Sequence, residues 1–446
     1  MKAKENAFLI FTALLMVVGI YFLGYRVVRT EFSLVLSLYS SLFGLMIFWF
    51  FYSKKRTVDW KAVFLVGFIL RLVLFPSIPL WSEDFARFLW DGELLNLGFN
   101  PYLNTPNQWV QLHSEDFSAY LALLYDRMNS PGYYSVYTPF NQFFFWLGAK
   151  LGGGSLIPGL LVLKGILIIG EIAVFFLLKS LLIRFGIGSQ KLIFYWLNPF
   201  VILEVIGNLH FEGLVLLFLL AVLFGLERKH RLVSASFLAF AVGLKLVPLI
   251  LAPGFLRIRS KQPWFWMGLG VISLVLFLPL LIDQSWRNFF QSLGLYQGKF
   301  EFNASIYYLG REVGYWIEGY NTIAYLTKGL SALTLLLILF LAFKKKINQT
   351  KDWIELWIGC YWIYLLLQPV VHPWYLIPGL GLSILTKKIG FLVWSLAVIL
   401  SYQAYGNHCN VEYPIVLVLE YSLVCVGLIY DYRQHYFTFP IKLLKK

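Results

Sequence analysis

Charged residues and cysteines are both scarce in this chain. Of its 446 residues, 13% are Asp, Glu, Lys or Arg, whereas soluble domains have about 25%. The three cysteines, Cys360, Cys409 and Cys425, show no metal-ligand spacing, so neither a disulfide framework nor a zinc site is predicted. Hydrophobic residues reach 59%. An ordinary soluble domain is therefore excluded.

Several well-known sequence signals are also missing. The chain has no Walker lysine loop, no Rossmann glycine run and no nucleophile elbow, which argues against nucleotide and serine-hydrolase chemistry of those kinds. It shows no internal repeat and no low-complexity segment. We therefore expect one domain over residues 1–446.

Apolar runs near membrane-spanning length recur along the chain, without the alternation of a transmembrane barrel. They predict an all-α, polytopic integral membrane protein with about 14 transmembrane helices. Residues 1–60 are expected to form an extra N-terminal helix pair. Its first run, 7–23, resembles a signal peptide but lacks a small-x-small cleavage site, so we read it as a retained helix.

Basic residues set the expected orientation. The net charge is +14, but the positive residues stand in short clusters between apolar runs, the positive-inside pattern, so membrane lipids rather than nucleic acid are the expected partners. The clusters are residues 54–56, 228–231, 257–261, 344–346, 387–388 and 442–446. With these on the cytoplasmic side, residues 80–155 and 283–322 form long external loops. Residues 232–256 are either one span or a hairpin broken around Lys245 and Pro248; the hairpin is preferred because it keeps the next basic cluster inside.

The stretch 81–102 combines acids and aromatics within this apolar chain. Glu83 and Asp84 follow an apolar run, and in isolation such a pair would more often cap a helix than catalyse. On a helix, however, Asp84, Arg87 and Asp91 share one face. An arginine neighbour would keep a general base ionised and oriented. We expect Asp84 to be that base, with Glu83 as the alternative.

The run E-D-x-x-R-F-x-W-D-G-x-x-x-x-x-G-x-N-P-Y at residues 83–102 resembles the first external loop of GT-C superfamily glycosyltransferases. It is most similar to bacterial polytopic mannosyltransferases that use polyprenyl-phosphate sugars. Glu83 stands where Asp is as common, and Phe88 where Tyr is common; neither departure touches Asp84. The resemblance implies a GT-C-like fold with juxtamembrane helices in the long first external loop. It also implies that Arg87 helps to bind the donor phosphate and that Asp91, Asn100 and Tyr102 line the substrate groove.

Five later segments resemble further motifs of that superfamily, in the same order. Each also has a simpler reading: an interfacial aromatic belt for the segments at 137 and 372–375, an interfacial histidine at 210, a snorkelling lysine at 245 and a chance glycosylation sequon at 303. The resemblance implies that His210 and Lys245 bind the donor phosphate. It places the following residues in the groove: Tyr137, Asn208, Glu212, Asn303, His372 and Tyr375. Lys164 and Glu171, two turns apart in an apolar run, are expected to serve packing or an internal ion pair.

The implied activity is transfer of a hexose, mannose by this resemblance, from a polyprenyl-phosphate donor to a hydroxyl of a lipid or glycan acceptor. The reaction is expected to invert the configuration at the anomeric carbon of the sugar. It is expected to take place at the external (periplasmic) face of a bacterial inner membrane, with no cofactor and no divalent metal. One alternative is a transporter or flippase for a lipid-linked or anionic solute, with Glu204, Glu212 and Lys245 along its path. Transporter folds, however, commonly show internal repeats with paired broken helices. A transferase that moves another group shares the architecture and stays open.

Overall fold

The computed structural model describes residues 2–56, 58–256, 263–407 and 410–436. Within these residues the chain is all-α, and its only β pairing is an isolated parallel bridge between Phe302 and Val370. The basic clusters expected at 257–261 and 442–446, and Cys409, lie outside the described residues.

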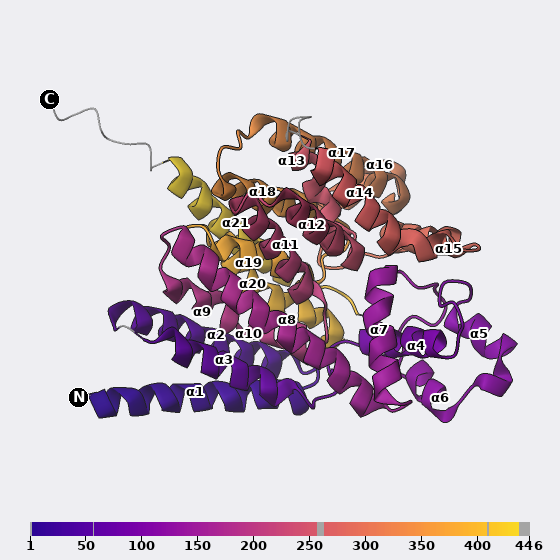
Figure 1. Ribbon diagram of the computed structural model, residues 1–446, viewed down its shortest axis with the longest axis horizontal. Coiled ribbons are helices and arrows are strands. Elements are labelled where there is room, and N and C mark those ends of the chain that lie inside the picture. The colour runs from indigo at the N-terminus through magenta and orange to yellow at the C-terminus, as the bar shows by residue number, and fades with distance from the viewer. Residues whose placement is uncertain (1, 57, 257–262, 408–409, 437–446) are drawn as a thin grey trace.

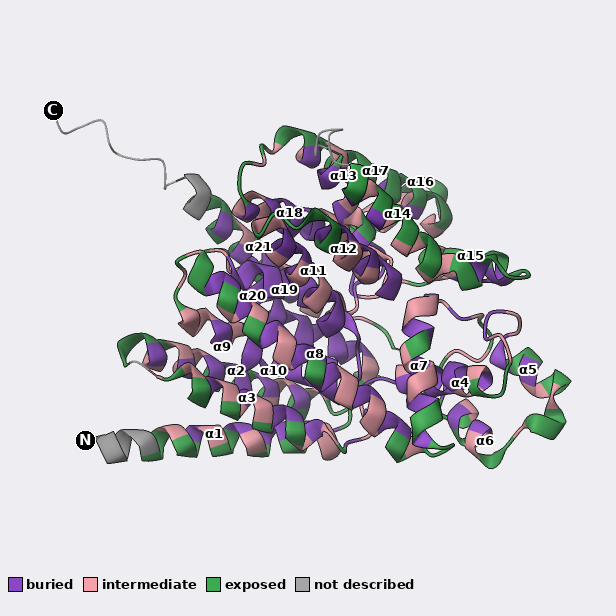
Figure 2. Cartoon of the chain, in the orientation of Figure 1, coloured by how far each residue is buried: buried purple, intermediate pink, exposed green. Residues whose placement is uncertain are grey.

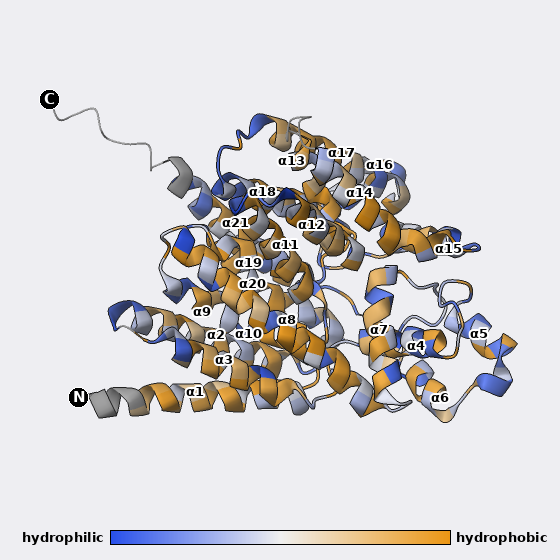
Figure 3. Cartoon of the chain, viewed as in Figure 1, coloured by the Kyte–Doolittle hydropathy of each residue, from blue (hydrophilic) through white to orange (hydrophobic). Residues whose placement is uncertain are grey.

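Six helices are long and apolar enough to cross a membrane, or seven if one bent pair counts as a span. The six are α1 (Lys2–Tyr25), α2 (Phe32–Lys55), α8 (Leu156–Arg184), α14 (Pro263–Phe277) with η5 (Leu278–Leu281), α17 (Ile323–Lys344) and α21 (Pro414–Tyr436). Figure 3 shows them as largely hydrophobic ribbons. The chain is thus an all-α multi-pass membrane protein, but the expected count of 14 spans is wrong for the described residues.

The expected count failed because many apolar runs fold into helices too short to span a bilayer, which takes about 20 residues. The remaining elements are α3 (Trp60–Leu74), α4 (Asp84–Asn96), α5 (Pro106–Leu112), η1 (Ser114–Asp116), α6 (Ala119–Asp126), α7 (Pro139–Gly152), η2 (Ser189–Leu192), α9 (Ile193–Trp196), α10 (Pro199–Val201), η3 (Ile202–Gly207), α11 (Glu212–Glu227), α12 (Arg231–Leu244), η4 (Val247–Leu251), α13 (Ala252–Phe255), α15 (Ser285–Lys299), α16 (Ile306–Glu318), α18 (Thr350–Leu367), η6 (Pro373–Leu376), α19 (Ile377–Ile384), α20 (Gly390–Ala397) and η7 (Val398–Gly406). Several of these, such as α19 and α20, are buried in the middle of the molecule (Figure 2). Their apolar sequences mark a protein core rather than separate membrane crossings.

The bent pair consists of α10 with η3, followed by α11, and the two halves meet at 111°. The break between them is residues 208–211, where Leu209 has a positive φ of 66° and the side chains are buried. A break of this kind at membrane depth is tolerated where protein surrounds it. A second break follows α12, where Lys245 is extended, so the preferred break at Lys245 is confirmed.

Residues 80–155 contain a cluster of short helices, α4 to α7, gathered on one side of the molecule (Figure 1). Thr138 precedes Pro139, whose fixed φ suits the first turn of α7. The α4 and α7 helices pack closely because Gly92 has no side chain. A Cβ at this position would lie 2.1 Å from the carbonyl oxygen of Phe145. Phe88 stacks on Phe145 with ring centroids 4.5 Å apart. This packing fixes where α4 begins, and hence where Asp84 lies.

Candidate active site

Asp84 is the first residue of α4, and its backbone N–H donates to the Ser82 hydroxyl at 3.3 Å. A carboxylate in a first helical turn is favoured by the unsatisfied N–H groups there. The preceding segment is anchored because the Trp81 indole N–H donates to the Val27 carbonyl at 2.8 Å. The Asp84 side chain keeps 26% of its surface exposed. It is therefore both held in place and accessible.

Glu83, the alternative base, has a partner of its own. Its carboxylate forms an ion pair with Arg29, which lies between α1 and α2. The Arg29 guanidinium also donates to the Trp81 carbonyl at 2.9 Å and lies over the Tyr405 ring at 4.2 Å. Glu83 thus ties the N-terminal helix pair to α4, which leaves Asp84 as the freer carboxylate.

His210 lies in the break between η3 and α11 and is only 2% exposed. Its Nδ1 is 3.0 Å from a carboxylate oxygen of Glu204. An ionised carboxylate only accepts hydrogen bonds, so Nδ1 carries the proton. Glu204 is itself held by the Asn208 amide at 3.1 Å and the Tyr402 hydroxyl at 2.6 Å. The ring orientation of His210 is therefore fixed from three elements of the chain.

The other ring nitrogen of His210, Nε2, is buried without a hydrogen-bond partner and lies 3.9 Å from a carboxylate oxygen of Asp84. Burial raises the pKa of the Asp84 carboxyl above its ordinary value, while electrostatic interactions with His210 and Lys245 oppose part of that rise. With the Nδ1–H tautomer, both facing atoms are acceptors. A hydroxyl group that approaches both atoms can donate its one proton to either of them.

Lys245 forms an ion pair with Glu212, which opens α11, and its ammonium lies 4.5 Å from the Tyr375 ring centroid. The lysine keeps 32% of its side-chain surface exposed, whereas Glu212 keeps 4%. Together with the extended backbone at residue 245, this places an accessible ammonium beside Asp84, whose pKa it lowers. The break at residues 208–211 and the break at Lys245 therefore both lie beside Asp84.

Stacked aromatic rings line one side of the candidate site, next to His210. The His210 ring stacks on Trp374 at 3.7 Å, and Trp374 stacks on His372 at 4.5 Å. His372 is hydrogen-bonded through Nε2 to the Tyr296 hydroxyl, and burial lowers its pKa to about 3, so its ring is neutral. The stack joins η6 and the loop helix α15 to the break that carries His210.

Arg87 makes its hydrogen bonds within the loop. Its Nε donates to Asp91 at 2.7 Å, and one Nη donates to the Tyr133 carbonyl at 2.9 Å. Asp91 also accepts from Ser135 and Gln142, at 2.5 and 2.7 Å. This buried network joins α4 to the segment before α7. The contacts of Arg87 and Asp91 are thus internal supports of the loop.

Asn100 and Tyr102 join the same loop to α15. The Asn100 amide donates to Ser285 at 2.9 Å, and the Tyr102 hydroxyl donates to the Tyr137 carbonyl at 2.6 Å. Burial raises the pKa of Tyr137, and the nearby Asp84 carboxylate raises it further, which places Tyr137 at the site. Asn100 and Tyr102 lie one layer behind it.

Asn303 belongs to a separate cluster. Its amide donates to Glu420 at 3.0 Å and its backbone N–H to Glu412 at 2.7 Å, both near the start of α21. Its neighbour Phe302 lies next to the site, with its ring 5.3 Å from that of His372. The structure therefore brings together Asp84, Tyr137, His210, Glu212, Lys245, His372 and Tyr375.

Sequence reasoning missed Glu204, Trp374, Tyr296 and Tyr402 as parts of this site. The sequence predicts a role for Glu204 only in the alternative transporter, although a lone carboxylate in an apolar run indicates a functional site in its own right. Tyr402 lies 198 residues from Glu204 along the chain, and no local pattern links the two.

Among the described residues, no group of three or more His, Cys, Asp or Glu side chains could hold a metal ion.

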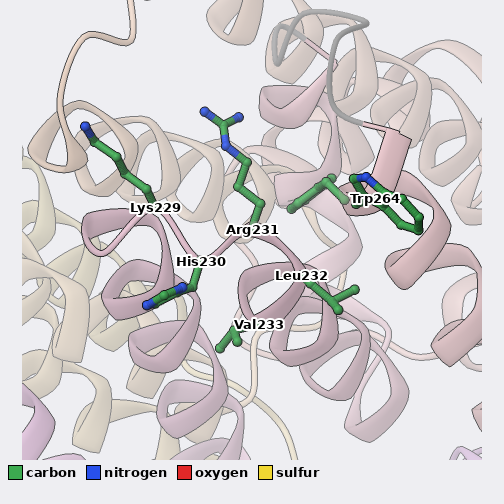
Figure 4. Close-up of a pocket in the computed structure, with 7 residues that line it drawn as sticks. Lys229, His230, Arg231, Leu232, Val233 and Trp264 are labelled. Atoms are coloured by element: carbon green, nitrogen blue, oxygen red, sulfur yellow. The ribbon is translucent and has the colours of Figure 1, made fainter.

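The pocket in Figure 4 lies away from the candidate site and is lined by Lys229, His230, Arg231 and Trp264 at the α11–α12 turn. The 16 residues of α11 separate that turn from Glu212 by about 22 Å. Its basic residues belong to the cluster at 228–231, which the sequence predicts to lie at the cytoplasmic membrane surface near lipid headgroups.

Comparison with known proteins identifies the family. Residues 10–259 match the MptA_B family model, described as alpha-(1->6)-mannopyranosyltransferase, N-terminal domain. The match covers more than half of the chain and includes Asp84, Glu204, His210, Glu212 and Lys245, and it confirms the resemblance to GT-C-type mannosyltransferases. No curated protein matches the chain. The chain belongs to the MptA_B family of alpha-(1->6)-mannopyranosyltransferases and is a glycosyltransferase.

Proposed function

We propose that the chain transfers mannose from a polyprenyl-phosphate donor to a hydroxyl of a lipid or glycan acceptor, with inversion, and that Asp84 is the general base. The observation that carries this proposal is the Asp84 carboxylate, accessible and 3.9 Å from the unpartnered Nε2 of His210. The family match supplies the sugar. A transfer that inverts and leaves an α linkage requires a β-linked donor.

In the proposed reaction, Asp84 takes the proton of the acceptor hydroxyl as the oxygen bonds to the anomeric carbon. The bond between that carbon and the phosphate oxygen breaks, and the electron pair leaves with the polyprenyl phosphate. One base suffices because phosphate leaves without a carboxylic acid partner. The raised pKa of Asp84 makes it a stronger base than an exposed aspartate.

Lys245 is placed to stabilise the charge that builds on the departing phosphate. Its ammonium is exposed on one side, and Glu212 and Tyr375 hold it on the other. His210, oriented by Glu204, presents its acceptor Nε2 3.9 Å from Asp84, so we assign it to the incoming hydroxyl rather than to the phosphate. Arg87 supports the loop through Asp91 and does not enter the phosphate site in this proposal.

The decisive assay uses purified protein in sealed vesicles with polyprenyl-phosphate β-[14C]mannose and a mannoside acceptor. We expect an α-linked labelled product that forms without added divalent metal and persists in EDTA. Labelled donor that crosses the bilayer with no new glycoside would instead identify a transporter, and the proposal would be abandoned.

We also propose that the site faces the external, periplasmic side. Glu115, exposed in the same segment as Asp84, offers a labelling position. In a Glu115→Cys variant free of native cysteines, a membrane-impermeant maleimide should react from outside. Reaction only after permeabilisation would place the site in the cytoplasm.

A further inference from the structure

A second cavity, of about 410 Å³, lies near the proposed active site. Residues at the start of α2 and at the end of η7 form its walls, together with Tyr413 and Val416 at the start of α21. The side chains that bear on its chemistry are Glu31, Phe32, Ser33, Gln403 and Tyr413. A cavity of this size falls in the range of small-ligand sites.

The cavity and the active site share the wall formed by η7. This 3-10 helix has three residues per turn, so Tyr402 and Tyr405 lie on one face and Gln403 and Gly406 on the next. Tyr402 donates to Glu204, and Tyr405 lies beneath Arg29, the partner of Glu83. The neighbouring face of the same helix lines the cavity, so η7 connects the cavity to the residues that hold Glu204 and Glu83.

Gln403 gives the cavity an unsatisfied acceptor. The residue is 4% exposed, and its Oε1 is buried without a hydrogen-bond partner. Leaving a buried carbonyl oxygen unpaired is unfavourable, and a hydroxyl of a bound ligand would remove that penalty. Its near neighbours do not compensate, because the Asn407 amide is occupied by the carbonyls of Ala404 and Val411.

The remaining lining has the chemistry of a saccharide site. Phe32 and Tyr413 provide aromatic faces, and the Tyr413 side chain is half exposed at the rim. Glu31 and Ser33 add a carboxylate and a hydroxyl, groups that can bond to sugar hydroxyls, although one Glu31 oxygen already accepts from the Val28 N–H at 3.1 Å. Among the described residues that line the cavity there is no lysine or arginine to bind a lipid phosphate.

We infer that this cavity binds a sugar unit of the acceptor glycan, beyond the unit whose hydroxyl reacts at Asp84. The inference rests on the proposed function. It assigns to Gln403 and Tyr413 recognition of acceptor length, with no contact to the reacting atoms.

The test compares two acceptors, octyl α-mannoside and α-1,6-linked mannotriose, in the full-length protein. Gln403→Ala should raise KM for mannotriose about five- to tenfold, the loss expected for one hydrogen bond, and leave the KM values of the monosaccharide and the donor unchanged. Gln403→Glu keeps an acceptor oxygen and should stay closer to the wild type. Tyr413→Ala, at a half-exposed position that folding tolerates, should show the same selective rise. Ser41→Ala, an exposed hydroxyl further along α2, is the matched control.

Saturation-transfer NMR with mannotriose provides a readout that needs no turnover. Binding by the wild type that Gln403→Ala and Tyr413→Ala weaken would support the cavity site, even if no mannose is transferred and the proposed function fails. Normal transfer, with an unchanged mannotriose KM in both variants, would overturn the inference and leave the proposed function intact. A dependence on added phospholipid that changes in these variants, without any change in mannotriose KM, would assign the cavity to lipid and likewise overturn it.

Discussion

Buried polar side chains are paired differently in α8 and in the broken segment before α11. In α8, Lys164 donates to the Leu74 and Ser77 carbonyls and to the Ser77 hydroxyl, at 2.6 to 2.8 Å. Glu171 accepts from Arg71 and Tyr195 at 2.7 and 2.8 Å. The two residues thus have separate partners rather than forming the internal ion pair that the sequence allowed.

The broken segment leaves one of its polar atoms free. Glu204 is fully paired, but the Nε2 of His210 has no partner and faces an accessible carboxylate at 3.9 Å. Burying a polar atom without a partner costs about 1–3 kcal/mol, so such an arrangement is a poor way to build stability. In α8 the buried charges are fully paired within the protein, whereas the break leaves an unpaired ring nitrogen beside an accessible carboxylate, as the proposed chemistry requires.

The largest expected effect is on Asp84. Asp84→Asn should lower mannosyl transfer about 10³-fold, because the amide cannot take the acceptor proton. Expression and the apparent melting temperature should stay close to wild type. Asp116→Asn, an exposed change in the same segment, is the control. Transfer at a near-normal rate by Asp84→Asn would remove the base from the proposal.

A smaller loss is expected when the support of His210 is changed. Glu204→Gln should reduce kcat roughly 10- to 100-fold, since Nδ1 loses its carboxylate and the ring its fixed orientation. Glu204→Asp should recover part of the rate. Equal losses for both variants, accompanied by a lower melting temperature, would show that Glu204 only maintains the fold.

The acid limb of the pH profile should reveal the environment of Asp84. Because burial raises the pKa of Asp84, the base loses its proton only at higher pH, and kcat/KM should fall on the acidic side above the usual aspartate range. Lys245→Gln removes a charge that lowers this pKa, so the limb should move to higher pH by about half a unit to one unit. Lys299→Gln, an exposed lysine of α15, should leave the limb in place. A shift to lower pH in Lys245→Gln would contradict the assignment.

The smallest effect is expected one layer behind the site. Asn100→Ala removes the bond to Ser285, and should lower the unfolding free energy by about 1 kcal/mol while changing transfer less than about threefold. Thermal unfolding in detergent and the transfer assay measure the two quantities. Gln111→Ala, an exposed change, is the control. A hundredfold loss of transfer would move Asn100 into the site itself.

The sequence predicted what is local. The helix that carries Asp84, Arg87 and Asp91, the break at Lys245 and the membrane class all follow from patterns within about 25 residues, and the structure agrees with them. The partners of Glu204 and Asn303 could not be predicted, because Tyr402 and Glu420 lie more than a hundred residues away. The span count failed for a related reason: an apolar run looks alike whether lipid or protein covers it, as in α19.

The contrast between the two regions is tested most directly by measuring Glu171→Gln and Asp84→Asn side by side, as transfer per folded molecule and as stability. Glu171→Gln leaves Arg71 buried without its partner charge, and should lower stability by about 3 kcal/mol while folded molecules keep transferring mannose. Asp84→Asn should do the reverse, losing transfer and keeping stability. A Glu171→Gln protein that is stable but inactive, beside an active Asp84→Asn protein, would contradict the account.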